Sequence, residues 1–277
     1  MQTILAAAKV TLSLAFLLYA SWSDYKTREV SNRVWAFYAP IALFLSLIEL
    51  LLSDPSKLPF FGLNFGVTAA FAIILFYTGA FGGADSKALM CIALALPFFP
   101  LEAPLLAGVP FFAPFLARAM SPISQNWFPF TILSNSVLVA ATSAIYMLLR
   151  NSIWRIKTRK KTFEGTLAHE SLGKKISVLI TGSKYSVAKL KENWHVYPLE
   201  DVEEGEEALK RKLVVVPKDE GRDEIVERLS KAVDAGKIDA YVWATPGLPM
   251  LIFITIGFIV ALLFGDIVWL LVSFVLG

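Results

Sequence analysis

The sequence is poor in the residues that build thiol and metal chemistry. Its 277 residues include one cysteine, Cys91, and two histidines, His169 and His195. A single cysteine excludes an intrachain disulfide and a cysteine-based metal site. The two histidines stand too far apart in the chain for metal-ligand spacing. We therefore expect neither a metal ion nor a cofactor.

Charge is scarce in the first half of the chain. Of the 26 Lys and Arg residues, eight precede residue 151 and eighteen lie in residues 151–246, together with 16 of the 23 acidic residues. The net charge of +3, with its basic excess beside apolar runs, is typical of membrane topology and not of nucleic-acid binding. We expect a transmembrane core in residues 1–150, a polar domain in residues 151–246 and a last helix in residues 247–277.

Long apolar runs dominate the remaining sequence. The chain is 56% hydrophobic and its mean hydropathy is +0.60. A helix that spans a bilayer needs roughly 20 apolar residues. Six runs approach this length and predict transmembrane helices: Leu5–Trp22, Val34–Leu52, Leu63–Gly79, Ala88–Leu105, Phe128–Leu149 and Leu248–Val275. We expect Lys9 to reach the membrane interface and Pro97 and Pro100 to kink the fourth helix.

Two stretches complete the predicted fold. The apolar residues 106–120 are few and hold two prolines, so whether they span, re-enter or lie on the membrane stays open. The polar block predicts a small α+β domain, with strands at Lys175–Thr181, Lys212–Pro217 and His195–Leu199 and a helix over Glu220–Ala235. The predicted class is a polytopic α-helical membrane protein with about six transmembrane helices and this domain inserted before the last one.

Basic residues assign the two sides of the membrane. The segment after the first predicted helix holds three basic residues, the segment after the third holds Lys87, and a basic cluster begins at Arg150. Such segments stay in the cytoplasm. We therefore expect a multi-pass protein of the cell membrane, with Asp24, Asp85 and the polar domain on the cytoplasmic side.

Asp24 and Asp85 stand at the ends of predicted helices on this same side. One carboxylate at a membrane boundary is most often a loop residue or a helix cap. Two on one face of a helix bundle can share a proton, because like charges a few ångströms apart do not both ionise cheaply. The ionised group can activate a water while the protonated one donates to a peptide carbonyl. The pair predicts peptide hydrolysis that needs no metal and no thiol.

Three glycines, Gly79, Gly82 and Gly83, precede Asp85. Glycine lets another backbone approach closely and accepts a positive φ. Beside a catalytic aspartate, these residues are expected to shape the backbone of the active site. The alternative is that they pack membrane helices or form a turn.

The two aspartate segments resemble a known family. Asp24-Tyr25-Lys26 with Asn32, and Gly82-Gly83-Ala84-Asp85-Ser86-Lys87, are similar to the motifs of the type IV prepilin peptidases, which are GxGD-type membrane aspartyl proteases. The likeness covers residues 5–150 and is nearest to the archaeal prepilin and preflagellin (archaellin) peptidases. Residues 240–249 are similar to the C-terminal part of archaeal members.

The resemblance implies an activity and a site. It implies an aspartic-type endopeptidase that removes short basic leader peptides from archaellin- or pilin-like precursors at the membrane surface. Asp24 and Asp85 would be the catalytic pair, without a choice between acid and base. Gly82, Gly83, Ala84 and Lys87 would support the site.

Two departures from the family pattern are visible. The family has glycine directly before its second aspartate, where this chain has Ala84, and alanine disfavours a positive φ. Bacterial members typically carry paired CxxC zinc motifs and a methyltransferase activity, which a chain with only Cys91 cannot share. The resemblance therefore implies an archaeal-type peptidase without methylation.

Other functional classes stay open. A transporter or channel would use acidic residues near the middle of helices for ion coupling, and a binding module would place the function in residues 151–246. The acidic run Glu200–Glu207 is expected to be a solvated loop or, less often, a surface that attracts a basic leader. Asp266 lies toward the opposite side of the membrane from the pair and receives no catalytic role.

Overall fold

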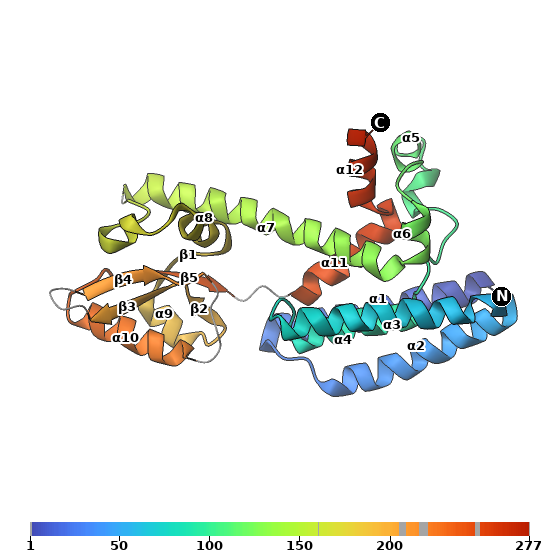
Figure 1. Cartoon of the computed structure of the whole chain (residues 1–277), viewed down its shortest axis with the longest axis horizontal. Coiled ribbons are helices and arrows are strands. Elements are labelled where there is room, and N and C mark those ends of the chain that lie inside the picture. The colour runs from blue at the N-terminus through green and yellow to red at the C-terminus, as the bar shows by residue number, and fades with distance from the viewer. Residues whose placement is uncertain (1, 160, 205–208, 216–220, 247–249, 277) are drawn as a thin grey trace. The chain divides into compact units, whose positions relative to one another are not determined.

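The chain divides into two compact units (Figure 1). The structure is a computed structural model and describes residues 2–159, 161–204, 209–215, 221–246 and 250–276. The first unit comprises residues 1–140 and 249–277, and the second comprises residues 141–248.

Helices are the only regular elements among the described residues of the first unit, and turns and irregular segments connect them. Its long elements are α1 (Gln2–Thr27), α2 (Asn32–Ser53), α3 (Leu58–Tyr77), α4 (Gly83–Ala95), α7 (Phe128–Thr158, which continues into the second unit), α11 (Met250–Phe264) and α12 (Ile267–Leu276). Its short elements are η1 (Pro55–Lys57), η2 (Leu105–Gly108), α5 (Ala113–Leu116) and α6 (Pro122–Asn126). Residues 106–120 thus form only short turns and helices.

Among the described residues, four helical stretches are long and apolar enough to cross a bilayer. They are α1, α2, α3 with its preceding turn, and α7. Helices α11 and α12 pass the same test only together, and they are bent by 57° at a break near Gly265. The predicted class, a polytopic helical membrane protein with a small sheet-containing domain late in the chain, is confirmed. Within the described residues the candidate spans number four, or five if α11 and α12 form one bent span, where about six were expected.

The fourth predicted helix differs most from the structure. It was expected to run with a kink to Leu105, but α4 has 13 residues and ends at Ala95. Leu96 leaves the helical conformation with φ −135° and ψ 64°. The cause is Pro97, because proline lacks an N–H to donate and disfavours the helical conformation in the residue before it.

Helix α4 lies at the centre of the first unit, in contact with α1, α2, α3 and α11. Its residues Ala88, Leu89 and Ile92 are buried in the main apolar core. Two hydroxyls fasten it: Ser86 Oγ donates to the Ala72 carbonyl at 3.1 Å, and the Ala95 carbonyl accepts from a serine of α2 at 3.0 Å. Short side chains and hydroxyl bonds of this kind are what hold membrane helices together.

Two charged residues of the first unit have partners that the sequence does not reveal. Lys9 does not reach an interface: it is 4% exposed and forms an ion pair with Glu49, which links α1 to α2. Asp266 accepts from Ser124 Oγ at 2.7 Å and from the Trp269 N–H at 2.9 Å, so it caps α12. Asp266 therefore has a local structural role.

The second unit is an α+β domain. It contains η3 (Gly165–His169), α8 (Leu172–Thr181), β1 (Ser183–Ser186), α9 (Val187–Glu192), β2 (Val196–Pro198), β3 (Glu200–Glu204), β4 (Leu209–Leu213), α10 (Arg222–Asp234) and β5 (Tyr241–Pro246). One sheet has the antiparallel order β1-β5-β2, and β3 pairs with β4 in a separate hairpin. The predicted strand at His195–Leu199 and the predicted helix before Gly236 are confirmed as β2 and α10.

Two strand predictions need correction. Lys175–Thr181 is not a strand but the end of α8, because the Ser171 hydroxyl caps the helix by accepting from the Lys174 N–H. The strand predicted at Lys212–Pro217 begins earlier, as β4, and residues 216–217 lie outside the described residues. A run of β-branched residues is thus a poor guide when a cap precedes it.

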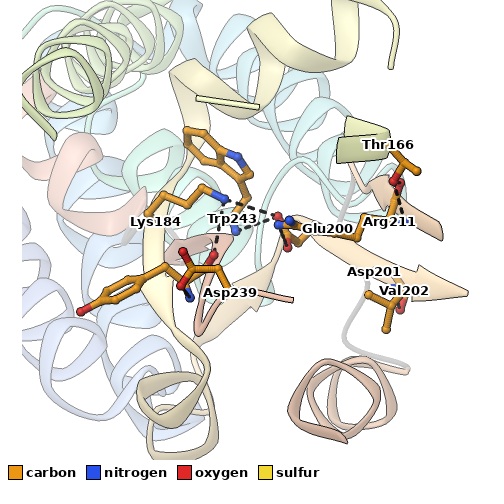
Figure 2. A network of polar contacts seen from close by, with 9 residues as sticks. Thr166, Lys184, Glu200, Asp201, Val202, Arg211, Asp239 and Trp243 are labelled. Carbon is orange, nitrogen blue, oxygen red and sulfur yellow. Dashed lines mark hydrogen bonds and ion pairs between the residues drawn. The ribbon is translucent and has the colours of Figure 1, made fainter. Parts of the chain in front are cut away.

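The acidic run is not a solvated loop where the structure describes it. Figure 2 shows Glu200, which is fully buried. Its carboxylate accepts from the Arg211 guanidinium at 2.7 Å and from the backbone N–H of Trp243 at 3.1 Å. The ammonium of Lys184 lies 3.8 Å from the same carboxylate, and burial lowers the pKa of Lys184 while the charge of Glu200 opposes this. Asp201 is paired with Arg228 at 2.9 Å. Glu200 thus joins strands of the domain and Asp201 joins β3 to α10, while residues 205–207 lie outside the described residues.

Candidate active site

Asp85 lies in the first turn of α4, and Gly82 is the N-cap residue of this helix. The carboxylate oxygen Oδ2 of Asp85 accepts from the Gly82 N–H at 2.9 Å, and the side chain is 9% exposed. A helix N-terminus presents unpaired N–H groups and a partial positive charge, both of which favour a carboxylate. The local sequence therefore fixes the position of Asp85 and leaves its other oxygen available.

Asp24 lies in the last turn of α1 and is half-buried. Its carboxylate interacts electrostatically with that of Asp85, so the fold brings the two predicted aspartates together. The helix stops directly afterwards, because Arg28 has φ 57° and its N–H closes the last turn on the Asp24 carbonyl at 3.0 Å. Ser23 Oγ then holds the following loop by donating to the Glu29 carbonyl at 2.7 Å.

A direct side-chain bond joins the two motifs. The Lys87 ammonium on α4 donates to Asn32 Oδ1, the first residue of α2, at 2.7 Å. Lys87 is thus placed to hold the loop after Asp24 against the helix that carries Asp85. The structure brings together Asp24, Asn32, Asp85 and Lys87, which the sequence separates by up to 63 positions.

The glycines before Asp85 have three different environments. Gly79 has φ +75°, a left-handed conformation that ends α3. At Gly82, a Cβ atom would stand 3.1 Å from Asp85 Oδ2, so the missing side chain leaves space for the carboxylate. At Gly83, a Cβ atom would make an ordinary contact of 3.6 Å with Phe76. Of the three glycines, only Gly82 stands where a Cβ atom would crowd a candidate catalytic side chain, that of Asp85.

Ala84 is compatible with the backbone at its position. It lies in α4, and it is absent from the described residues that have a positive φ and are not glycine, which are Arg28 and Arg159. A helical conformation favours alanine over glycine. The departure from the family pattern at this position therefore does not distort the site.

Comparison with known proteins identifies the family. Residues 11–148 match the type IV leader peptidase family, and residues 174–267 match the type II archaeal peptidase A24 C-terminus. The chain belongs to the type IV leader peptidase family. It is similar to the preflagellin peptidase of Methanococcus voltae, with 28% identity over 258 residues, which cover 92% of this chain and 94% of that protein.

As a member of this family, the protein is a peptidase. Its several long apolar helices and its family indicate a multi-pass membrane protein. The first matched segment contains both aspartate motifs, and the second contains β5, which includes most of the tail resemblance. Residues 247–249 of that tail lie outside the described residues.

One group of residues beside the site was not found from the sequence. Ser21 lies one turn before Asp24 on α1, and its hydroxyl is 2.7 Å from that of Thr255 on α11. Nothing in the sequence connects two residues 234 positions apart. In the part of the chain that the structure describes, no three His, Cys, Asp or Glu side chains are grouped as metal ligands.

Proposed function

We propose that Asp24 and Asp85 are the catalytic pair of an aspartic endopeptidase that cleaves basic leader peptides from archaellin- or pilin-like precursors. The observation that carries the proposal is the electrostatic interaction between the two carboxylates, one in the last turn of α1 and the other in the first turn of α4, with Asp85 accepting from the Gly82 N–H at 2.9 Å. The family and the similarity to a preflagellin peptidase support the substrate class.

The chemistry follows from a pair that holds one proton. The ionised carboxylate takes a proton from water, whose oxygen attacks the scissile carbonyl carbon, while the protonated carboxyl gives its proton to the carbonyl oxygen. As the tetrahedral intermediate collapses, the leaving amine takes a proton from the first carboxyl, and the second recovers one from the intermediate's hydroxyl. The peptide bond is hydrolysed and the pair regains its starting proton count. Either aspartate can be the base.

The site is proposed to face the cytoplasm. Lys26, Arg28, Arg33 and Lys87 surround the ends of the helices that carry the two aspartates. Basic residues close to membrane spans are retained on the cytoplasmic side. A leader that is short and basic would remain on the same side, so its junction with the hydrophobic helix of the precursor would reach the aspartates.

Substitution of each aspartate tests the proposal. Membranes that contain Asp24→Asn or Asp85→Asn should insert the protein normally and fail to shorten a purified preflagellin, as read by mass spectrometry of the product N-terminus. Asp54→Asn is the matched control, because Asp54 lies at the far end of α2, outside the site. Wild-type cleavage by either of the first two variants would refute the catalytic pair.

A further inference from the structure

Helix α11 contacts the turn of α1 that precedes Asp24. The Ser21 hydroxyl lies 3.0 Å from the Leu251 carbonyl and 2.7 Å from Thr255 Oγ1. Thr255 Oγ1 lies 2.9 Å from the Leu251 carbonyl and 3.3 Å from the Leu17 carbonyl. Ser21 and Thr255 are 8% and 4% exposed. Two buried hydroxyls therefore lie between the two helices, within hydrogen-bond distance of each other and of carbonyls on both.

This bridge is directional, unlike the packing around it. Both helices also contribute buried apolar residues such as Leu17, Ile254 and Phe258 to the main core, and apolar burial does not fix the rotation of a helix. Residues three apart lie on the same side of a helix, so Ser21 is on the side that carries Asp24. A rotation of α1 by ~10° would move a carboxylate ~6 Å from the helix axis by ~1 Å.

Helix α11 is itself held firmly against α7. At Gly257, a Cβ atom would come within 2.7 Å of the Ile132 carbonyl and the Ser136 N–H, so the two backbones are in close contact. Asn135 on α7 binds both sides of the break after α11, donating to the Gly265 carbonyl at 2.9 Å and accepting from the Ile267 N–H at 3.1 Å. Thr255 therefore projects from a fixed helix.

We propose that Thr255 is a positioning residue for the peptidase reaction, which acts through Ser21 to set the orientation of Asp24. The inference rests on the proposed function of Asp24. It gives the last helices of the chain, which follow the polar domain, a part in assembling the active site. Thr255 itself touches neither substrate nor water in this proposal.

The test separates the hydroxyl of Thr255 from its shape. Thr255→Val keeps the volume and removes the hydroxyl, and Thr255→Ser keeps the hydroxyl. With preflagellin as substrate and equal amounts of inserted enzyme, Thr255→Val should lower kcat about tenfold with little change in KM, because one buried hydrogen bond and its directional effect are lost. Thr255→Ser should restore most of kcat. Ser21→Ala combined with Thr255→Val should be little worse than Ser21→Ala alone, because Ser21→Ala already removes the Ser21 contacts with both Thr255 and the Leu251 carbonyl.

The control is Thr68→Val, which changes another buried threonine, on α3, and should leave kcat unchanged. Wild-type kcat in Thr255→Val would overturn the inference, as would an equal loss in Thr68→Val or in Thr255→Ser. The Asp24→Asn variant, assayed in the same experiment, separates the proposed catalytic role of Asp24 from the positioning role of Thr255. Activity in Asp24→Asn overturns the proposed function, whereas an inactive Asp24→Asn beside a fully active Thr255→Val overturns only the role of Thr255.

Discussion

The space at Gly82 gives the sharpest prediction about the active site. Gly82→Ala would place a Cβ atom 3.1 Å from Asp85 Oδ2, closer than most real contacts of this kind, so the carboxylate must shift by a few tenths of an ångström. The backbone is not the obstacle, because φ −71° and ψ 163° at Gly82 suit any residue. The substitution therefore acts on the position of Asp85.

The size of the effect follows from the bond that the shift disturbs. The Gly82 N–H donates to the carboxylate at 2.9 Å, and a hydrogen bond to a charged group contributes about 1.5–3 kcal/mol. Losing about half of that in the transition state lowers kcat by about four- to twelvefold. Gly83→Ala is the matched control, since its Cβ atom meets Phe76 at an ordinary 3.6 Å and a helical alanine is favoured over glycine. Its kcat should change by less than about twofold.

The assay compares single-turnover cleavage of preflagellin by the two variants in the same detergent. A thermal unfolding curve for each variant verifies that stability does not explain the difference. If Gly82→Ala and Gly83→Ala cleave at the same rate, the view that Gly82 exists to make room for the carboxylate of Asp85 is wrong.

Two further predictions concern the membrane helices. Glu49→Leu alone should destabilise the protein by about 3–5 kcal/mol, because it leaves the buried Lys9 without its partner. In thermal unfolding, the double variant Lys9→Met with Glu49→Leu should recover most of this lost stability. A double variant as unstable as Glu49→Leu would contradict this. Glu29 lies in the exposed loop after Asp24, so the cysteine of Glu29→Cys should react with a membrane-impermeant maleimide in inverted vesicles and not in right-side-out ones. The buried Cys91 should add little background labelling. The reverse pattern would place the aspartates outside the cell.

Features that depend on local chemistry could be predicted from the sequence. The apolar runs located α1, α2, α3 and α7, because hydrocarbon thickness sets a minimum length that few other segments meet. Motif resemblance brought Asp24 and Asp85 into one hypothesis, and charge placed them on one side. The end of α4 is also a local feature, because Pro97 disfavours the helical conformation in the residue before it.

Features that depend on the rotation of helices could not be predicted. The partners Lys9 and Glu49 are 40 positions apart, and Ser21 and Thr255 are 234 apart. Hydropathy gives the length of an all-apolar helix but not the face that meets a neighbour, because lipid and protein are equally apolar. The hydroxyl bridge and the ion pair therefore became visible only with the packed helices.

The contrast between Gly82 and Ala84 indicates what the small residues before Asp85 are for. A requirement for a special backbone conformation would fall on position 84, directly before the aspartate, yet the chain has alanine there within an ordinary helix. The constraint falls instead on position 82, where a side chain would meet the carboxylate oxygen itself. Because the same Gly82 donates its N–H to that oxygen, one residue both holds the carboxylate and leaves it room. The glycine requirement is thus steric and belongs to the aspartate, so alanine at position 84 is compatible with full activity while alanine at position 82 should slow catalysis.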